Sequence, residues 1–354
     1  GHAFSYCSSL TSVDIPDSVT SIGNYAFYSC SSLASVTIGN GVSSIGDNAF
    51  AGSSLRSIII PDAVTTIGDY AFDNCSSLRF VKIGNGVTSI GDDAFNWCFS
   101  LTSVTIGNAV TSIGKNAFHS CSSLKSVTIG NDLIRIGWGA FVGCDSLSEV
   151  YISDLSAWCM ISFGDDAANP LCYGAKLYLN NVEITELVIP DDITEIKDYA
   201  FAGSSLRSIT IPDTITFIGK SAFRECSSLS GVYISDLSAW CRINFSDDKS
   251  NPLRYGAKLY LNNVEITELV IPDDITEIKG YAFAGSSLTS IAIHDGVTDI
   301  VYAAFEYCNS LTSVTIGKGV TVIGNLAFYS CSLLSEVTCN ATTPPVLGSE
   351  AFSD

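Results

Sequence analysis

The hydrophobic positions of this chain follow a pattern that returns about every 23 residues. One repeat reads A-F-x-x-C-S-S-L-x-S-V-x-I-x-x-x-V-T-x-I-G-x-x, and the pair Ala-Phe occurs thirteen times. Successive pairs are 22 to 24 residues apart, except for two intervals of 60 residues. A fixed period of this length indicates a repeat protein whose coils stack on one another. We therefore predict a single solenoid over residues 1–354 instead of two globular domains.

Each repeat contains one clear strand signal. In residues 124–129, Leu124, Val127 and Ile129 are expected to point inward, and Ser126 and Thr128 outward, by the alternation of a strand. The segment V-T-x-I-G predicts a second short strand, and the Ala-Phe segment predicts one short helical turn that faces the core. We expect each Phe to pack on the Phe of the next coil. The fourteen predicted strands start at Leu10, Leu33, Leu55, Leu78, Leu101, Leu124, Leu147, Ile184, Leu206, Leu229, Ile266, Leu288, Leu311 and Leu334.

The two long intervals contain enlarged coils, at about residues 150–183 and 232–265. They belong to a tandem duplication in which residues 140–221 correspond to residues 222–303. Each enlarged coil has S-D-L-S-A-W-C and Y-G-A-K-L-Y-L-N-N-V-E-I. Ser153 or Asp154 can cap a short helix, and Asn180-Asn181 fits a tight hairpin. Trp158 and Trp240 are expected to fill the core where the Phe is missing.

Composition and charge limit the possible functions. The chain has 17 Lys and Arg against 36 Asp and Glu, a net charge of −19, which disfavours nucleic-acid binding. There is no run of about 18 apolar residues, so no membrane-spanning segment is expected. The three histidines occupy different repeat positions in distant coils, so no catalytic His arrangement is predicted. We expect no enzyme activity and no cofactor.

Cysteine and aspartate suggest binding chemistry, but each has a simpler interpretation. Nine of the 13 cysteines share one repeat position. They could form disulfides or a metal ladder, but neighbouring coils give parallel Cβ vectors, so a column of buried free thiols is favoured. No Cys-x-x-Cys occurs, so no zinc site is expected. Asp pairs could bind calcium; the alternative that we favour is solvated turns, with Asp165-Asp166 and Asp247-Asp248 as the best exceptions.

The outward face of the strands is the remaining candidate site. Most outward positions are Ser or Thr, which offer few anchors. The larger side chains predict a recognition patch, because Tyr is a rigid and amphipathic contact residue. The alternative is that these side chains only cover the sheet beside the enlarged coils. The candidate binding residues are Phe80, Lys82, Glu149, Tyr151, Glu186, Val188, Tyr233, Glu268 and Val270.

The repeat closely resembles the BspA-like bacterial surface proteins of the leucine-rich repeat superfamily. The resemblance is carried by A-F-x-x-C-S-S-L-x-S-V-x-I-P-x-x-V-T-x-I-G, by S-D-L-S-A-W-C to L-Y-L-N-N, and by T-T-P-P. It implies a leucine-rich-repeat-like right-handed coil stack, mostly β with short helical turns and about 14 parallel strands on one face. It also implies a secreted or cell-surface location and a role in adhesion.

Two functions follow as hypotheses. The first is a non-enzymatic extracellular binding or adhesion protein whose strand face contacts host or bacterial proteins or glycans. The second is a structural spacer that presents other domains of a longer cell-surface protein. Because residue 1 lies in the middle of a repeat, we also interpret the chain as part of something longer.

Overall fold

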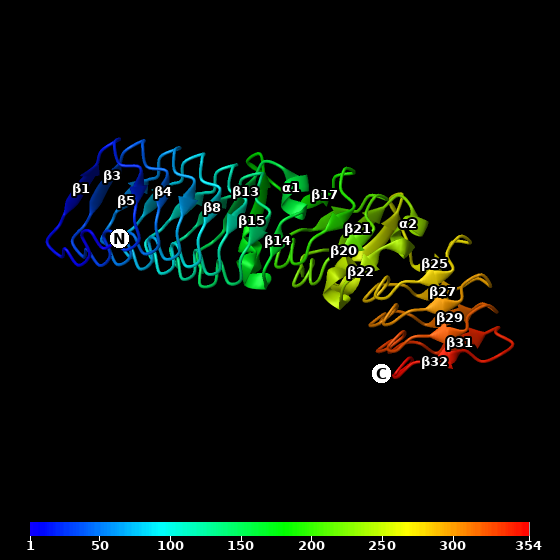
Figure 1. The fold of residues 1–354 in the computed structure, drawn as a ribbon. Helices are drawn as coiled ribbons and strands as arrows, with labels where there is room; N and C mark the ends of the chain where they lie inside the picture. The colour runs from blue at the N-terminus through cyan, green and yellow to red at the C-terminus, as the bar shows by residue number, and fades with distance from the viewer. Residues whose placement is uncertain (354) are drawn as a thin grey trace. The chain divides into compact units, whose positions relative to one another are not determined.

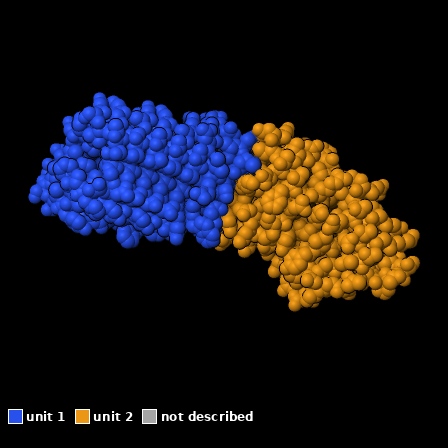
Figure 2. Space-filling view, viewed as in Figure 1, with its two compact units in different colours: residues 1–184 blue, residues 185–354 orange. Residues whose placement is uncertain are grey.

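The computed structural model describes residues 1–353. The chain forms two compact units, residues 1–184 (unit 1) and 185–354 (unit 2), drawn blue and orange in Figure 2. Each unit is a stack of short coils whose parallel strands run side by side (Figure 1). The predicted β-solenoid architecture is thus confirmed, and a single solenoid over residues 1–354 stays a prediction.

Unit 1 has two strand faces. The long strands form a pair, β1 (Ser12–Ile15) and β3 (Ser35–Ile38), and a seven-stranded sheet of β5 (Ser57–Ile59), β7 (Phe80–Lys82), β9 (Ser103–Thr105), β11 (Ser126–Thr128), β13 (Glu149–Ile152), β15 (Lys176–Leu179) and β16 (Val182–Glu183). The short strands form a second sheet of β2 (Ser21–Ile22), β4 (Ser44–Ile45), β6 (Thr66–Ile67), β8 (Ser89–Ile90), β10 (Ser112–Ile113), β12 (Arg135–Ile136) and β14 (Ser162–Phe163).

Unit 2 is built in the same way from four sheets. Its long strands are β17 (Glu186–Val188), β19 (Ser208–Thr210), β21 (Gly231–Ile234), β23 (Lys258–Leu261) and β24 (Val264–Glu265) in one sheet, and β25 (Glu268–Val270), β27 (Ser290–Ala292), β29 (Ser313–Ile316) and β31 (Glu336–Cys339) in another. Its short strands are β18 (Glu195–Ile196), β20 (Phe217–Ile218) and β22 (Asn244–Phe245), then β26 (Glu277–Ile278), β28 (Asp299–Ile300), β30 (Val322–Ile323) and β32 (Val346–Leu347).

The strand register follows the repeat. Val127 of β11 lies opposite Val104 of β9 and Val150 of β13, so each inward side chain packs on its equivalents in the neighbouring coils. The structure adds two parallel strands to the fourteen that the sequence indicates. These are β15 and β23, which pair in parallel with β13 and β21. The sequence Lys-Leu-Tyr-Leu of these two strands lies inside the enlarged coils, outside the L-x-S-V-x-I pattern.

The Ala-Phe segment differs from the prediction. It forms hydrogen-bonded turns instead of a helical turn, and Asp93 and Trp97, which flank Ala94 and Phe95, have positive φ values of 53° and 57°. Those φ values end any helical run, because a non-glycine residue rarely adopts them within regular structure. Phe95 N–H instead donates to Ala117 O of the next coil at 2.8 Å. The coil is therefore held to its neighbour along a third row of backbone hydrogen bonds.

The Phe side chains form the stack that the sequence predicts. In unit 1, the Phe95 ring lies between Phe72 and Phe118, with ring centroids 5.1 and 5.3 Å away and planes within 4° of parallel. In unit 2, Phe305 lies in the same way between Phe283 and Phe328, at 5.4 and 5.1 Å. These distances fit offset stacking of rings carried on coils about one strand spacing apart.

The thirteen cysteines form no disulfide, and ten of them are buried. The Cys98 thiol donates to Phe72 O at 3.3 Å, and the same contact recurs from Cys121 to Phe95 O. The thiols thus act as small core side chains that also bond a carbonyl of the preceding coil. This confirms their interpretation as buried thiols, except at Cys7 and Cys172, which are half-buried, and Cys339, which is exposed.

The enlarged coils contain all the helices of the described chain. They are α1 (Leu155–Cys159), η1 (Asp166–Ala168) and η2 (Pro170–Tyr173), then α2 (Leu237–Arg242), η3 (Asp248–Ser250) and η4 (Pro252–Tyr255). Asp154 caps α1 by accepting from Ala157 N–H at 3.0 Å, as predicted. Trp158 and Trp240 are each 1% exposed, which confirms them as core side chains. Their helices face the interior, and the coil then returns to the strand face through β15 or β23.

Candidate functional site

The strand face carries every residue of the predicted patch, but the patch is not continuous. Phe80, 48% exposed, and Lys82 lie on β7, whereas Glu149 and Tyr151 lie on β13 of the same sheet. Strands β9 and β11 separate them. At about 4.8 Å per strand, the two pairs are on the order of 14 Å apart. The structure therefore divides the unit 1 residues into two small groups.

In unit 1 the side chain of Tyr151 is engaged by other residues of the same sheet. Tyr151 stacks on Tyr178 of β15, with ring centroids 4.9 Å apart. The Tyr151 hydroxyl donates to Glu149 Oε2 at 3.0 Å, and this bond raises the pKa of the tyrosine. A ring that is stacked on one side and bonded at its hydroxyl has fewer free donors for a ligand.

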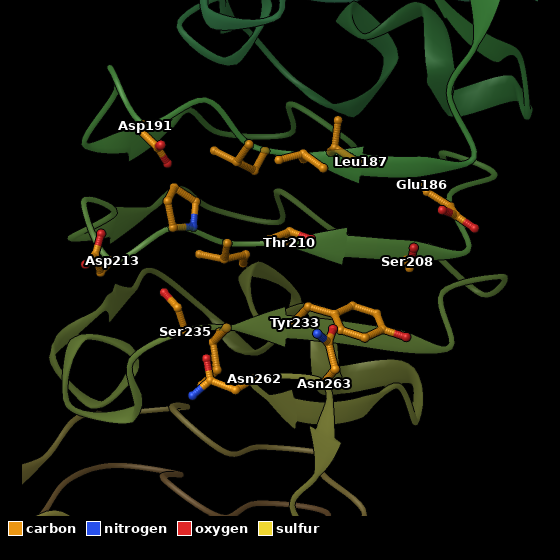
Figure 3. Close-up of a pocket in the computed structure, with 15 residues that line it drawn as sticks. Glu186, Leu187, Asp191, Ser208, Thr210, Asp213, Tyr233, Ser235, Asn262 and Asn263 are labelled. Carbon is orange, nitrogen blue, oxygen red and sulfur yellow. The ribbon is translucent and has the colours of Figure 1, made fainter.

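In unit 2 the corresponding surface forms a groove of about 570 Å³. It crosses β17, β19 and β21 and ends against the turn between β23 and β24 (Figure 3). Three of the predicted residues, Glu186, Val188 and Tyr233, line it together. Ser208 and Thr210, from the strand between them, form its floor with small hydroxyl side chains. In this groove, three residues of the predicted patch line one concave surface together.

A glycine explains why the two copies differ. Gly231 occupies the position that Glu149 has in unit 1. A Cβ atom on Gly231 would lie 2.9 Å from Cε2 of Tyr233, so the tyrosine ring covers the space that a side chain would need. Tyr233 stacks on Tyr260 at 4.7 Å but has no glutamate beside it on its own strand. In Figure 3 its ring points toward the end of the strands at which Glu186 and Ser208 lie.

The wall of the groove is the hairpin of the enlarged coil. Asn262 and Asn263 have φ values of 50° and 66°, the conformation of a type I′ turn, which Asn tolerates better than most residues. Strand β24 then runs antiparallel to β23, with Leu261 opposite Val264. The hairpin predicted from Asn180-Asn181 is confirmed in unit 1 by the antiparallel pair β15 and β16. In unit 2 the same device closes one side of the groove.

The groove carries charge of one sign. Glu186, Asp191 and Asp213 line it, and none of its fifteen lining residues is Lys, Arg or His. Figure 3 shows Asp191 and Asp213 near one end of the strands and Glu186 near the other. All three carboxylates are exposed. Negative charges that line one concave surface, with no cation among them, attract cationic groups.

Glu268 and Val270 lie outside this groove. They belong to β25, which starts a separate sheet, and β24 is the last strand of the groove sheet. Val270 is 67% exposed. Although the duplication gives them the same sequence context as Glu186 and Val188, the structure does not bring them to the same site.

Sequence reasoning missed the acidic and amide ends of the groove. Asp191, Asp213, Ser235, Asn262 and Asn263 line it and were not among the candidate residues. A signal was present, because Asp191 belongs to an Asp pair and Asn262-Asn263 repeats the hairpin motif. Each motif was interpreted only as a turn. The sequence alone does not show that these turns lie on the same face.

The Asp pairs with the strongest calcium case serve as backbone acceptors. Asp165 Oδ1 accepts from Gly139 N–H at 3.0 Å and from Ala168 N–H at 2.8 Å. Asp247 Oδ1 accepts from Ser221 N–H at 2.9 Å. Across residues 1–353, no group of three or more His, Cys, Asp and Glu side chains is arranged to hold a metal ion. These carboxylates therefore have a structural role, namely to fix the enlarged coil to the coil before it.

The histidines have unrelated surroundings. His2 stacks on Tyr25, His119 contacts Asn96 Oδ1 at 2.9 Å, and His294 contacts Pro272 O at 2.9 Å. Among the described residues, none of the helices has the length and apolar character to span a membrane.

The parallel strand face, the short returning arm and the repeated Leu, Val, Ile and Phe positions define a leucine-rich-repeat type of β-solenoid. The sequence pattern of the BspA-type leucine-rich repeat region matches residues 1–96, 43–164, 174–246 and 255–354, in six copies. The chain belongs to this family. A search of the curated proteins gives no match.

Several solved structures of bacterial proteins resemble the chain. A leucine-rich repeat protein from Bacteroides ovatus is 23% identical, with 99% of this chain and 78% of that chain covered and a TM-score of 0.40. A leucine-rich cell surface protein from Faecalibacterium prausnitzii is 25% identical, with 94% and 88% covered and a TM-score of 0.39. A leucine-rich repeat protein from Eubacterium ventriosum is 20% identical, with 91% and 82% covered and a TM-score of 0.49.

Proposed function

We propose that this protein is a non-enzymatic binding or adhesion protein that works outside the bacterial cell and uses the groove of unit 2 to hold a protein ligand. The observation that carries the proposal is the groove itself. It is concave, it lies on the rigid strand face, and it combines Tyr233 and Val188 with three carboxylates and no cation. The proposal rests also on membership of the BspA-type family.

The chemistry of the groove indicates which part of a ligand it would hold. Val188 is 64% exposed, so it offers an apolar contact that is unmet within the described chain. The carboxylates of Glu186, Asp191 and Asp213 complement Lys or Arg side chains. We therefore propose a basic segment with an apolar residue beside its cation as the bound element. Phe80, Lys82, Glu149, Tyr151, Glu268 and Val270 stay predictions as further contacts.

The thiols are compatible with an extracellular location. Free cysteines in an oxidising environment are at risk when they are exposed and ionised. Burial raises the pKa of Cys75 and Cys144 to about 12, so neither is a thiolate at neutral pH. A secreted or surface location is therefore consistent with the ten buried thiols.

Capture by the whole chain tests the proposal. The purified protein is applied to an array of extracellular matrix proteins, bacterial surface proteins and glycans, and each captured partner is measured by biolayer interferometry. We expect capture of a protein with an exposed basic segment, weakened as NaCl rises because screening reduces attraction between exposed charges. Asp213→Asn with Glu186→Gln should weaken capture about tenfold or more, since each lost ion pair with a partner removes attraction.

The duplication supplies a matched control. Tyr233→Ala should weaken capture and should lower the melting temperature no more than Tyr151→Ala does, because both rings are half-exposed and each stacks on one tyrosine. Tyr151→Ala removes the equivalent ring in unit 1 and should leave capture unchanged. Equal losses in both variants would contradict the groove as the contact site and would favour the wider patch predicted from sequence.

A spacer predicts a different outcome. If the chain captures no protein and no glycan at micromolar concentrations, the binding proposal is wrong and the structural role is favoured. Capture of a glycan alone, insensitive to Asp213→Asn and Glu186→Gln, would overturn the basic-segment proposal while a binding role is kept.

A further inference from the structure

A second hollow, of about 440 Å³, lies in unit 1 and is lined by Arg56, Ser77, Arg79 and Ser100. Arg56 and Arg79 occupy the same repeat position, directly before β5 and β7. Arg79 N–H donates to Arg56 O at 2.9 Å, so the two residues lie in adjacent coils. Their side chains therefore leave the fold about one strand spacing apart, on the order of 5 Å. Ser77 lies two residues before Arg79, and Ser100 holds the same repeat position one coil later.

Within the described chain, the structure shows no ion pair for these two arginine side chains and no hydrogen bond for these two serine hydroxyls. In residues 1–353, no carboxylate lies within 4.0 Å of either guanidinium, and the structure gives neither serine hydroxyl a hydrogen bond. Arginines elsewhere do find partners: Arg242 pairs with Asp274 at 2.6 Å and Arg254 with Asp248 at 3.0 Å. Acidic residues outnumber basic ones by 36 to 17. The two adjacent arginines, with no carboxylate beside them, therefore form a small basic site on a chain that is acidic overall.

The neighbouring strand surface has the same sign. The outward positions of β5 and β7 are Ser57, Ile59, Phe80 and Lys82, with no carboxylate among them. The outward positions of β9 and β11 are Ser or Thr. Lys82 is exposed and forms no ion pair in the described chain. The electrostatic potential around the two arginines is thus positive, because the neighbouring strand positions supply no negative charge to offset it.

We propose that the Arg56–Arg79 hollow binds a tetrahedral oxyanion, a sulfate ester or a phosphate monoester, carried by a larger ligand. Guanidinium groups donate N–H bonds as flat forks, and two forks on adjacent coils reach different oxygens of one anion. The hydroxyls of Ser77 and Ser100 can donate to a third oxygen. A planar carboxylate has only two oxygens and leaves some of these donors unused. The volume exceeds that of one such group, so the carrier occupies the remainder.

Direct titration of the arginines tests the site. The ¹⁵N-labelled whole chain is titrated with sodium sulfate and, separately, sodium phosphate, at constant ionic strength set with sodium chloride. We expect saturable shifts of two arginine Nε–Hε signals, which are assigned by their loss in Arg56→Gln and Arg79→Gln. The double variant should bind at least about tenfold more weakly, because charge-assisted hydrogen bonds are lost.

Arg207→Gln is the matched control. Arg207 has the same repeat position in unit 2 but stands between Thr185 and Ser230, without a second arginine. It should leave the titration unchanged. Arg56→Lys with Arg79→Lys keeps both charges without the forks and should recover only part of the affinity. Thermal unfolding by circular dichroism checks that each variant is folded.

The second part of the experiment identifies the carrier. A sulfated oligosaccharide is compared with its desulfated form, and a phosphoserine peptide with its unmodified form. Preference for one modified ligand, lost in the double variant and kept in Arg207→Gln, supports the site and names its source. Shifts that rise linearly without saturation, or equal affinity in the double variant, would overturn the proposal. Saturation by the inorganic ions with no preference for either modified ligand would reduce the site to an adventitious ion only, which also overturns it.

Discussion

At the scale of single residues, one repeat position holds Asp73, Asn96 and His119 in successive coils, and these side chains contact one another. Asp73 accepts a hydrogen bond from Asn96 Nδ2 at 2.9 Å, and His119 contacts the other end of that amide. Burial raises the pKa of the Asp73 carboxyl, and the amide offsets only part of that effect. The arm of each coil thus contains polar groups that are satisfied across coils but remain partly desolvated, and their ionisation affects stability.

Asp73→Asn should therefore raise the melting temperature at pH 7. A carboxyl whose pKa is higher in the folded state binds its proton more tightly when folded, so stability is lost as pH rises from the unfolded pKa, about 3.9, through the folded one. The asparagine has no charge to desolvate and can still accept from Asn96. We expect a rise of about 1–3 °C at pH 7 that shrinks below about pH 4.

Asp14→Asn is the control for this prediction, because Asp14 is exposed on β1 and its loss changes net charge equally. Equal shifts in both variants would show that net charge, and not burial at Asp73, sets the effect.

The thiols give a second prediction at this scale. In the native protein, a disulfide reagent should modify Cys339 within seconds to minutes and Cys7 and Cys172 slowly, because only these three are exposed or half-buried. Burial raises the pKa of Cys172 to about 12, so it should be the slower of the two. Thirteen thiols should react in denaturant. Cys339→Ser should remove the fast phase, and fast modification of more than three native thiols would contradict the buried column.

At the scale of elements, sequence determined most of what is local. The Phe stack and the Asn180-Asn181 hairpin were predictable because periodicity and turn chemistry are written within a few residues. The turns around Phe95 were not, because Asp93 and Trp97 have positive φ without the glycine that usually marks it. Bonds to the next coil impose that conformation. The groove was not predictable either, since it needs Gly231, the Asn262-Asn263 turn and the strands before them to meet in space.

The Phe stack should make central rings far more costly to remove than peripheral ones. Phe95→Ala leaves a cavity between two rings in a fully buried site and should destabilise the protein by about 3–5 kcal/mol. Phe4 is 50% exposed, so Phe4→Ala should cost about 1–2 kcal/mol. Urea unfolding monitored by circular dichroism measures both. Phe95→Leu, which leaves a smaller void, serves if the alanine variant does not fold; equal losses at positions 95 and 4 would contradict the stack.

At the scale of the whole molecule, the fold distributes stability along each unit by nearest-neighbour contacts. A coil in the middle of unit 1, such as the one that carries Phe95, is bonded to a coil on both sides. The family, the solenoid architecture and the acidic surface could all be predicted from the sequence because they depend on the repeat alone. The proposed binding sites depend on departures from the repeat, and the three-dimensional structure is needed to see how those residues come together.

Hydrogen exchange should report this distribution. Amides of Phe72, Phe95 and Phe118 each bond the next coil at 2.8 Å, and they should exchange most slowly. The equivalent amide of Phe4 belongs to a coil whose ring is half exposed, so it should exchange faster. Exchange followed by mass spectrometry of peptides tests this, and uniform protection across unit 1 would argue for one all-or-none unit instead.

The turn carboxylates described for the enlarged coils have counterparts in the ordinary ones, where Asp62 Oδ1 accepts from Asn85 N–H at 2.7 Å. Most ordinary coils thus carry the same ring, and nine cysteines hold the same repeat position, so neighbouring coils repeat the same contacts. A whole ordinary coil can therefore be duplicated or deleted, and the coils on either side can still make the same kinds of contact. The number of coils can accordingly change while neighbouring coils keep contacts of the same kinds.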